Sequence, residues 1–273
     1  MKQDRYAVFG NPIEHSLSPR IHAAFAARME QEMSYDARLA PLDGFADAVR
    51  RFAAEGGRGA NVTVPFKEEA FRLCDLLTPR ARDAGAVNTL SLEEGVIQGD
   101  NTDGVGLVHD LEHNLGWPLE GRRILLVGAG GAARGVLGSL LGQRPARLVL
   151  TNRTPEKAAA LVDEFARDAA SPLASVAMPR LEEAFDIVIN ATSASLSNEP
   201  LPLPGGIFAS DSLAYDLMYG RHTPFLEQAK QAGASVLADG LGMLVEQAAE
   251  AFYVWRGLRP PTRPVLEMLR AEY

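Results

Sequence analysis

The chain has 273 residues, of which 47% are hydrophobic and 23% charged, as in an ordinary globular protein with one large or two modest domains. Its 27 basic and 35 acidic residues give a net charge of −8, which repels nucleic acid and anionic membranes, so neither is an expected partner. The first ten residues carry no apolar signal segment, and no stretch approaches the length of apolar chain that a membrane helix needs. Cys74 is the only cysteine, so a disulfide framework within the chain is excluded and a cytoplasmic protein is expected.

The first hundred residues alternate between strand and helix patterns. The expected elements are strands at residues 6–10, 33–41 and 59–64, helices that begin near residues 18, 43 and 67, and a hairpin over residues 88–101. Ser18 should be the N-cap of the first helix, with Pro19 at its first helical position. The third helix should extend to Leu77, and a fourth should run from Thr102 to about Leu115.

The stretch GANVTVPFK, residues 59–67, places a lysine just beyond a buried strand. Asn61 and Thr63 alternate with valines, so a strand would put both polar side chains on one face. Pro65 ends the ladder because it has no N–H to donate. Lys67 is therefore a plausible proton donor at the mouth of the strand.

The second half of the chain repeats a strand–helix alternation. Strands are expected at residues 122–127, 147–154, 185–193, 213–219 and 235–240, with helices after the first, the second and the fourth, and with two C-terminal helices at about 241–257 and 263–272. This alternation predicts an α/β architecture with parallel sheets. Two units are expected, residues 1–101 and roughly 103–239, and the pattern leaves open which of them the C-terminal helices cover.

A glycine turn follows the strand that ends at Val127. Gly128, Gly130 and Ala133 occupy the positions of the dinucleotide fingerprint G-x-G-x-x-G/A, in which the backbone approaches a pyrophosphate. The alternative is a tight turn without a ligand, which the preceding strand and following helix make less favoured.

The end of the next strand indicates which dinucleotide would bind. An NAD site has a carboxylate there, whereas this chain has TNRT at residues 151–154. Arg153 is suited to a 2′-phosphate, and Lys157 could add a second positive charge. NADP is therefore the expected cofactor, and the alternative is that both are solvated surface residues.

Other polar segments could serve the same chemistry. Asp100 and Asp103, in DNTDG, could orient Lys67, although this segment equally suits a turn and a helix cap. Ser16 and Ser18, in HSLSP, suit a carboxylate ligand or plain capping.

Two further features have a structural interpretation. His109, Glu112 and His113 match the zinc pattern H-x-x-E-H, but this spacing recurs by chance on amphipathic helices, so no metal is expected. Cys74 lies among apolar residues and is expected to be a core residue rather than a nucleophile.

Taken together, the chain resembles the shikimate dehydrogenase family over nearly its whole length. The segments that carry the resemblance, in family order, are HSLSP (15–19), NVTVPFK (61–67), GAVNT (85–89), DNTDG (100–104), GAGGAARG (128–135), TNRT (151–154), NATS (190–193), YDLMY (215–219), TPFL (223–226) and DGLGMLVEQAAEAF (239–252).

The resemblance implies a two-domain α/β fold. An N-terminal substrate domain with a mixed sheet, residues 1–102 plus 240–273, would contain an inserted Rossmann-type NADP-binding domain, residues 103–239. The implied reaction is the reversible NADPH-dependent reduction of 3-dehydroshikimate to shikimate in aromatic amino-acid biosynthesis, by a monomer or homodimer.

The resemblance also implies site residues. Lys67 and Asp103 would be the catalytic pair. The substrate would contact Ser16, Ser18, Thr63, Asn88, Asp103, Tyr215 and Gln247. The cofactor would contact Gly128, Ala129, Gly130, Gly131, Ala132, Asn152, Arg153, Thr154, Lys157, Thr192, Met218 and Gly240. The sequence departs from the family pattern in two places. Ala194 stands where glycine is common, and YDLMYGRHTP (215–224) is shorter than the usual segment by about one residue and lacks its common proline.

Two other functions are compatible with this fold. One is a quinate/shikimate dehydrogenase that uses NAD, against which Arg153 and the paired serines argue. The other is a non-catalytic, ligand-sensing regulator, which should lack Lys67 or Asp103 and carry a DNA-binding domain.

Overall fold

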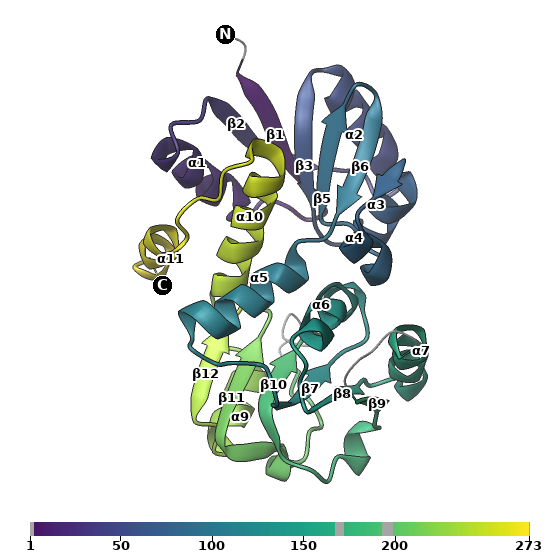
Figure 1. The fold of residues 1–273 in the computed structure, drawn as a ribbon, viewed down its shortest axis with the longest axis vertical. Helices are drawn as coiled ribbons and strands as arrows, with labels where there is room; N and C mark the ends of the chain where they lie inside the picture. The colour runs from purple at the N-terminus through teal and green to yellow at the C-terminus, as the bar shows by residue number, and fades with distance from the viewer. Residues whose placement is uncertain (1–2, 167–171, 193–198, 273) are drawn as a thin grey trace. The chain divides into compact units, whose positions relative to one another are not determined.

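The computed structural model describes residues 3–166, 172–192 and 199–272 (Figure 1). Ala194, one of the two departures from the family pattern, lies outside the described residues. The chain forms two compact units, one of Met1–Gly106 with Leu244–Tyr273 and the other of Leu107–Met243. The boundaries fall within the helices α5 (Asp103–His109) and α10 (Leu241–Arg256).

Unit 1, Met1–Gly106 with Leu244–Tyr273, contains a mixed six-stranded sheet in the order β2-β1-β3-β5-β6-β4. β1 pairs in parallel with β2 and β3, β5 pairs antiparallel with β3 and β6, and β4 pairs in parallel with β6. The strands are β1 (Asp4–Gly10), β2 (Met33–Leu39), β3 (Gly57–Val62), β4 (Leu76–Leu77), β5 (Thr89–Glu93) and β6 (Val96–Asp100). The expected hairpin over residues 88–101 is confirmed by β5 and β6.

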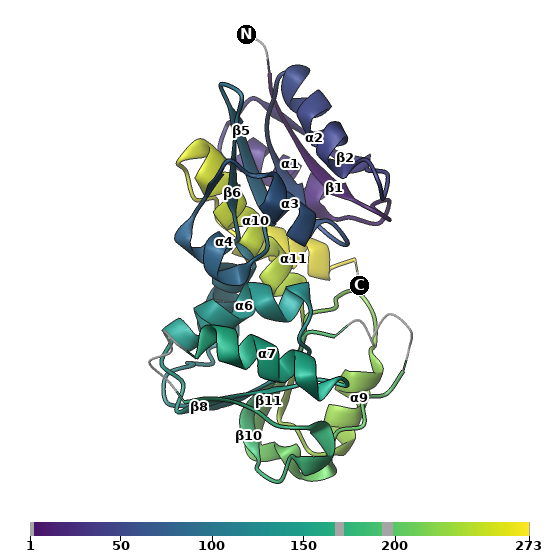
Figure 2. The ribbon, with the colours of Figure 1, turned by 90° about the vertical axis from the view of Figure 1, so that its right-hand side faces the viewer.

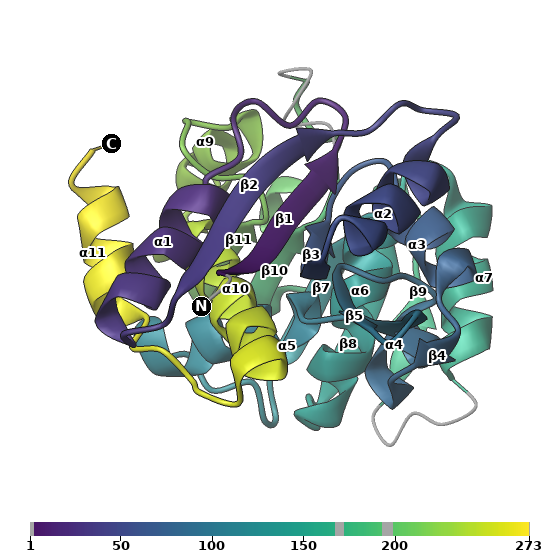
Figure 3. The same cartoon turned by 90° about the horizontal axis from the view of Figure 1, so that it is seen from above.

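Helices cover both faces of this sheet, with α1 and α10 on one side and α2 and α3 on the other (Figure 3). Period-two alternation explains why, since Ala7 and Phe9 of β1 pack into the core that α2 covers, whereas Tyr6 stacks on Trp255 of α10. The helices are α1 (Ser18–Arg28), α2 (Phe45–Ala54), α3 (Lys67–Leu73), α4 (Pro79–Ala84) and α11 (Arg263–Arg270), together with the C-terminal part of α10.

Two expectations for unit 1 were wrong in detail. α3 ends at Leu73 rather than Leu77, because Leu76 and Leu77 pair with β6 as the short strand β4. Ser18 is the first residue of α1 and not its N-cap. Leu17 takes that position, and the Ser16 hydroxyl accepts a hydrogen bond from the Ser18 amide at 3.3 Å.

Unit 2, Leu107–Met243, contains a parallel six-stranded sheet in the order β12-β11-β10-β7-β8-β9. This is the doubly wound dinucleotide-binding order, with β7 first in sequence and near the middle of the sheet. The strands are β7 (Arg123–Val127), β8 (Arg147–Thr151), β9 (Leu173–Ser175), β10 (Phe185–Asn190), β11 (Phe208–Asp216) and β12 (Val236–Asp239).

The unit 2 sheet is buried on both faces. Ile124 and Leu126 of β7 pack with α6 (Gly131–Gly142) and α7 (Pro155–Phe165), and these two helices lie on the same side of the sheet (Figure 2). Leu125 and Val127 pack on the opposite face with α9 (Pro224–Gln231). Burial on both faces explains the uninterrupted apolar run in β7. α5 is followed by a π-helical turn, Asp110–Asn114.

The expected two-domain α/β class, with a mixed sheet in one unit and a Rossmann-type sheet in the other, is therefore confirmed. Among the described residues, the structure contains no helix with both the length and the apolar character that crossing a bilayer requires.

Candidate active site

Lys67 and Asp103 form an ion pair in unit 1. Lys67 begins α3, shortly after β3 ends, and Asp103 begins α5, just after β6. The Lys67 Nζ donates to Asp103 Oδ2 at 2.5 Å, and the two side chains are only 19% and 7% exposed. This is a short, charge-assisted hydrogen bond, largely shielded from water, in which the carboxylate fixes the direction of the ammonium group.

Asn88 holds the second oxygen of the carboxylate. Its Nδ2 donates to Asp103 Oδ1 at 2.8 Å, and Thr102 Oγ1 and Gln247 Oε1 lie 2.9 and 3.3 Å from the same nitrogen. The Asn88 Oδ1 accepts from the backbone amide of Thr102 at 2.8 Å. Asn88 is buried, so this one amide side chain connects the start of β5 to the residues that begin α5 and to α10.

Gln247 is placed by direct contact between α5 and α10. A Cβ atom on Gly106 would lie 2.7 Å from the backbone nitrogen of Gln247, so a larger residue at position 106 would push α10 away. The Gln247 Nε2 donates to the carbonyl of Leu244 at 2.8 Å. Its Oε1 therefore faces Asn88 and Thr102, and Gln247 belongs to the same polar cluster.

A second layer of polar residues supports this cluster. Tyr35 donates to Asn61 Oδ1 at 2.7 Å, and the Asn61 amide donates to the Asn88 carbonyl and to Thr89 Oγ1, each at 3.1 Å. Burial raises the pKa of Tyr35 well above its ordinary value, and the Ser18 hydroxyl beside it opposes that shift. A continuous chain of polar contacts thus runs from Ser18 to Asn88.

The remaining residues expected at the substrate lie near the ends of the same strands. Ser16 follows β1 and contacts Ser18, as described above. Thr63 lies one residue beyond β3, half-buried, with its Cγ2 so close to Gly10 that a Cβ there would come within 2.6 Å.

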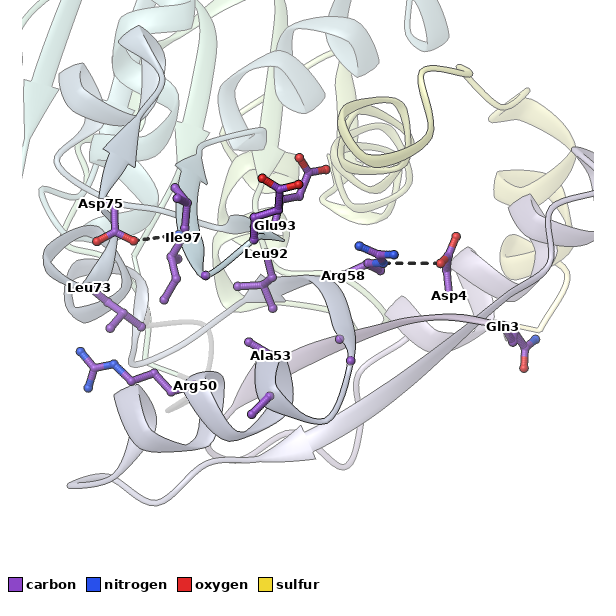
Figure 4. Close-up of a pocket in the computed structure, with 16 residues that line it drawn as sticks. Gln3, Asp4, Arg50, Ala53, Arg58, Leu73, Asp75, Leu92, Glu93 and Ile97 are labelled. Carbon is purple, nitrogen blue, oxygen red and sulfur yellow. Dashed lines mark hydrogen bonds and ion pairs between the residues drawn. The ribbon is translucent and has the colours of Figure 1, made fainter. Parts of the chain in front are cut away.

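A cavity in unit 1 lies at the opposite end of the sheet from these residues. It has a volume of about 740 Å³ and is lined by the start of β1 and β3 and by the β5–β6 turn, with Arg58 paired to Asp4 at 3.7 Å (Figure 4). Asp75 accepts from the Ile97 amide at 2.8 Å on its wall. None of the expected site residues lines this cavity.

The glycine turn in unit 2 is open to a ligand. Gly128 has φ of +120°, and a Cβ on it would lie 3.0 Å from the Ala191 carbonyl oxygen, so only glycine suits this position. A Cβ on Gly130 or Gly131 would meet nothing within 4 Å. The backbone at the start of α6, a helix of 12 residues, is therefore accessible to a phosphate group.

A cavity of about 480 Å³ adjoins this turn. Eight of the expected cofactor residues line it, namely Gly128, Ala129, Gly130, Asn152, Arg153, Thr154, Lys157 and Thr192. The Arg153 side chain is 88% exposed, with Glu199 at 4.0 Å on the same cavity. Asn152 Nδ2 donates to the Thr154 carbonyl at 2.9 Å, which shapes the loop that carries Arg153.

Met218 and Gly240 lie side by side at the ends of β11 and β12, and neither lines that cavity. The Gly240 amide donates to the Met218 carbonyl at 3.0 Å. A Cβ on Gly240 would come within 2.2 Å of the Leu217 carbonyl oxygen, so the segments fit only with glycine there. Gly131 and Ala132 belong to the first turn of α6, beside the cavity rather than on its wall.

Tyr215 lies in the core of unit 2, which contradicts the expected contact with the substrate carboxylate. It is 0% exposed on β11, its hydroxyl donates to Asp110 Oδ2 at 2.7 Å, and the Met243 amide lies 3.3 Å from the same hydroxyl. Burial, and then the Asp110 charge, raise the pKa of Tyr215 well above its ordinary value. Tyr215 therefore joins β11 to the start of α10 and is a structural residue.

The zinc pattern does not assemble a binding site in the described part of the chain. His109 and His113 stack with ring centroids 4.2 Å apart, and no group of three or more metal-ligating side chains gathers among the described residues. Cys74 donates to the Ala70 carbonyl, and burial raises the pKa of its thiol to about 12, which disfavours the nucleophilic thiolate form.

Sequence reasoning missed the supporting layer of Tyr35 and Thr89, and it gave no role to Arg80. Tyr35 alternates with polar residues along β2, which predicts its burial but not its partner Asn61. These contacts join residues that are far apart in the chain, so no local sequence pattern predicts them.

A doubly wound parallel sheet with an open glycine turn, together with an oriented lysine–carboxylate pair, defines a dinucleotide-dependent oxidoreductase. Comparisons with known proteins identify its family. The model for the shikimate dehydrogenase substrate binding domain matches residues 8–90, that for shikimate / quinate 5-dehydrogenase matches residues 111–198, and that for the shikimate 5′-dehydrogenase C-terminal domain matches residues 240–270. The chain belongs to the shikimate dehydrogenase family.

Individual relatives agree over the full length. The shikimate dehydrogenase (NADP(+)) of Dechloromonas aromatica is 60% identical over 271 residues, which cover 98% of each chain. The crystal structure of an Ael1 enzyme from Pseudomonas putida is 49% identical, with a TM-score of 0.92 and 98% of both chains covered. The shikimate 5-dehydrogenase of Thermus thermophilus, in complex with NADP(H) and shikimate, is 36% identical, with a TM-score of 0.88 over 99% of this chain and 100% of that one.

Proposed function

We propose that this protein catalyses the reversible NADPH-dependent reduction of 3-dehydroshikimate to shikimate, with Lys67 and Asp103 as the acid–base pair. The observation that carries the proposal is the 2.5 Å contact between Lys67 and an Asp103 carboxylate that Asn88 holds from its other side. Family membership supports the reaction, because the curated relatives are shikimate dehydrogenases named for NADP(+).

Unit 1, Met1–Gly106 with Leu244–Tyr273, is the substrate-binding domain in this proposal, which the resemblance expected at residues 1–102 with 240–273. Ser16 and Ser18 would receive the substrate carboxylate at the start of α1, and Thr63, Asn88 and Gln247 would contact the ring hydroxyls. Tyr215 has no part in substrate binding, because its hydroxyl is buried against Asp110.

Unit 2, Leu107–Met243, is the cofactor-binding domain in this proposal, which the resemblance expected at residues 103–239, and the residues present fit a dinucleotide phosphate. The open backbone at Gly130 and Gly131 admits the pyrophosphate. Arg153, on the loop of residues 151–154 that contains no carboxylate, and Lys157, in the first turn of α7, would supply the positive charge that a 2′-phosphate requires. The pyrophosphate would also lie beside Ala129 and Ala132, and the 2′-phosphate beside Asn152 and Thr154. The nicotinamide side would be formed by Thr192, Met218 and Gly240.

The proton chemistry is assigned to Lys67. NADPH, when bound, would supply the hydride that reduces the carbonyl carbon. Addition of hydride develops negative charge on the substrate oxygen, and the Lys67 ammonium donates the proton that neutralises it. In the reverse direction the neutral amine accepts the alcohol proton. Asp103 fixes the direction of Nζ and stabilises the ammonium form through their charge-assisted bond.

We also propose a cellular location and an oligomeric state for the enzyme. Cys74 is the only cysteine and forms no disulfide, which fits a reducing compartment, so we place the protein in the cytoplasm. It would act as a monomer or homodimer.

An initial-rate assay tests the proposed reaction. Shikimate and quinate are each combined with NADP⁺ and NAD⁺, and reduced nicotinamide is followed by absorbance. Fast turnover with shikimate and NADP⁺ alone is expected. Comparable rates with quinate or NAD⁺ would instead indicate a quinate/shikimate dehydrogenase, and no turnover with any pair would overturn the proposal.

A further inference from the structure

Arg80 bridges two parts of unit 1 that carry candidate site residues. It lies on α4, whose N-cap Thr78 accepts from the Ala81 amide. Its guanidinium forms a side-on pair with Asp100, Nε to Oδ1 and Nη2 to Oδ2, both at 2.6 Å. The remaining Nη1 donates to Glu250 Oε1 at 2.8 Å. One planar fork therefore ties the end of β6 to α10.

Asp100 sets the conformation of the segment that delivers Asp103. Its Oδ1 accepts from the Asn101 amide at 2.7 Å, and its backbone carbonyl accepts from the Asn88 amide at 3.0 Å. Asn101 Oδ1 in turn accepts from the Asp103 amide at 3.1 Å. Asn101 thus links the position of Asp100 to the direction of the Asp103 side chain.

Glu250 ties α10, the helix that carries Gln247, to Arg80. The two residues lie three positions apart on α10, so they are neighbours along one face of the helix. The second oxygen of Glu250 accepts from Arg259 at 2.6 Å. Among the described residues, Arg259 pairs with Glu250 and Glu246 rather than with Asp100, which makes it a natural comparison for Arg80.

The hydrogen bonds of this bridge require an ionised Asp100 and a cationic Arg80. Burial by itself would raise the pKa of the Asp100 carboxyl, but Arg80 and the Thr78 hydroxyl hold it below the ordinary value. Removal of the guanidinium would leave a carboxylate that is only 8% exposed without its cation. The segment 100–103 would then move to reach water or another donor.

We propose that Arg80 is a positioning residue for the reaction, acting through Asp100 on Asp103 and through Glu250 on Gln247. It contacts neither substrate nor cofactor. By fixing the two ends of the polar cluster relative to each other, it keeps the Asp103 carboxylate in place for Lys67. This inference rests on the roles proposed above for Lys67 and Asp103.

The test compares Arg80→Met with Arg259→Met. Both changes remove a cation from Glu250, at side chains that are 31% and 37% exposed, but only the first removes a cation from Asp100. Arg80→Lys keeps the charge and loses the planar fork, and it serves as a folded variant if Arg80→Met is too unstable. kcat, KM for shikimate, KM for NADP⁺ and the thermal midpoint are measured for each full-length protein.

We expect Arg80→Met and Arg80→Lys to lower kcat by about 10- to 100-fold, since displacement of a catalytic group by a fraction of an ångström has effects of this size. KM for NADP⁺ should stay unchanged, and Arg259→Met should keep nearly the wild-type kcat. Equal kcat values for Arg80→Lys, Arg259→Met and wild type would overturn the proposal. The Lys67→Ala variant, assayed in parallel, separates the two proposals, because its full activity would contradict the catalytic pair itself.

Discussion

The Lys67 ammonium and the Asp103 carboxylate form a hydrogen bond of 2.5 Å although 36 residues separate them in the chain. Each begins a helix that follows a strand of the unit 1 sheet, so the sheet brings them together. Asn88 contacts the second carboxylate oxygen and joins this pair to Gln247. The pair is therefore held from several sides, as a group that must keep its orientation during proton transfer should be.

Replacement of Asn88 by alanine should lower kcat/KM for shikimate by about 100-fold, because Asp103, Thr102 and Gln247 all lose a common partner. The buried Thr102 amide also loses its acceptor, at a cost of about 1–3 kcal/mol in the free energy of unfolding. Steady-state kinetics and urea unfolding measure the two effects. Asn114→Ala, which removes an amide that donates to Asp110 in unit 2, is the control and should leave KM for shikimate unchanged. Wild-type kinetics for Asn88→Ala would contradict the arrangement.

Arg153→Gln should raise KM for NADP⁺ by about 10- to 100-fold, the value of a charge-assisted contact to the 2′-phosphate. KM for NAD⁺ should hardly change, because NAD⁺ lacks that phosphate. Stability should also be unaffected, since the Arg153 side chain is 88% exposed and 4.0 Å from Glu199. Arg144→Gln removes another exposed, ion-paired arginine of unit 2 and should alter neither constant. Equal losses with both nucleotides would rule out a 2′-phosphate contact.

Tyr215→Phe tests the buried position of this residue. The change removes the hydrogen bond to Asp110 and should lower the free energy of unfolding by about 1–3 kcal/mol. KM for shikimate should stay at the wild-type value, because the hydroxyl lies in the core of unit 2. A large rise in KM with unchanged stability would show instead that Tyr215 reaches the substrate.

His22 should make the stability of the protein sensitive to acid. It is 0% exposed and stacks on Tyr35 with ring centroids 4.1 Å apart. Burial lowers its pKa from 6.5 to about 3, a shift that Asn61 opposes only in part. The unfolded chain binds a proton below pH 6.5, whereas the folded protein does so only near pH 3. The contribution of neutral His22 to the free energy of unfolding is therefore fully present above pH 6.5 and is lost as the pH falls towards 3.

The size of this effect can be measured with His22→Phe, which keeps an aromatic ring in the stack. Between pH 6.5 and 3 the wild type should lose up to about 5 kcal/mol more of its unfolding free energy than the variant does. Urea unfolding at several pH values gives both curves. Parallel curves over this range would show that His22 takes up its proton in the folded protein as readily as in the unfolded chain.

Local sequence patterns were sufficient to predict most of the fold. The apolar run that ends at Val127 predicted β7, and the glycine turn after it predicted the start of α6. The end of α3 was not predictable in this way, because Leu76 and Leu77 leave the helix only to pair with β6. α4 was missed although Thr78 and Pro79 are a typical N-cap and first-turn pair.

The polar cluster was predictable only in part. Lys67, Asp103, Asn88 and Gln247 were expected from the family resemblance, and the structure brings them into contact. Contacts such as that of Asn88 with Gln247, 159 residues apart, depend on how α10 packs in unit 1 and have no local signal. The burial of Tyr215, in contrast, did have a local sequence signal.

Alternation along β11 places Leu213 and Tyr215 on the same buried face of the sheet. Because both faces of a doubly wound sheet are buried, a position such as Tyr215 in a strand away from the sheet edge is expected in the core. The expectation taken from the resemblance placed Tyr215 near the substrate carboxylate instead.

The most direct test of the catalytic pair is the turnover of Lys67→Ala, with NADPH affinity measured by fluorescence titration of the same protein. We expect kcat to fall by about two to four orders of magnitude, the contribution of a positioned general acid, while the dissociation constant for NADPH stays at the wild-type value. Lys230→Ala, an exposed lysine on α9, is the matched control and should be fully active. Undiminished turnover of Lys67→Ala would contradict the assignment of Lys67 as the proton donor.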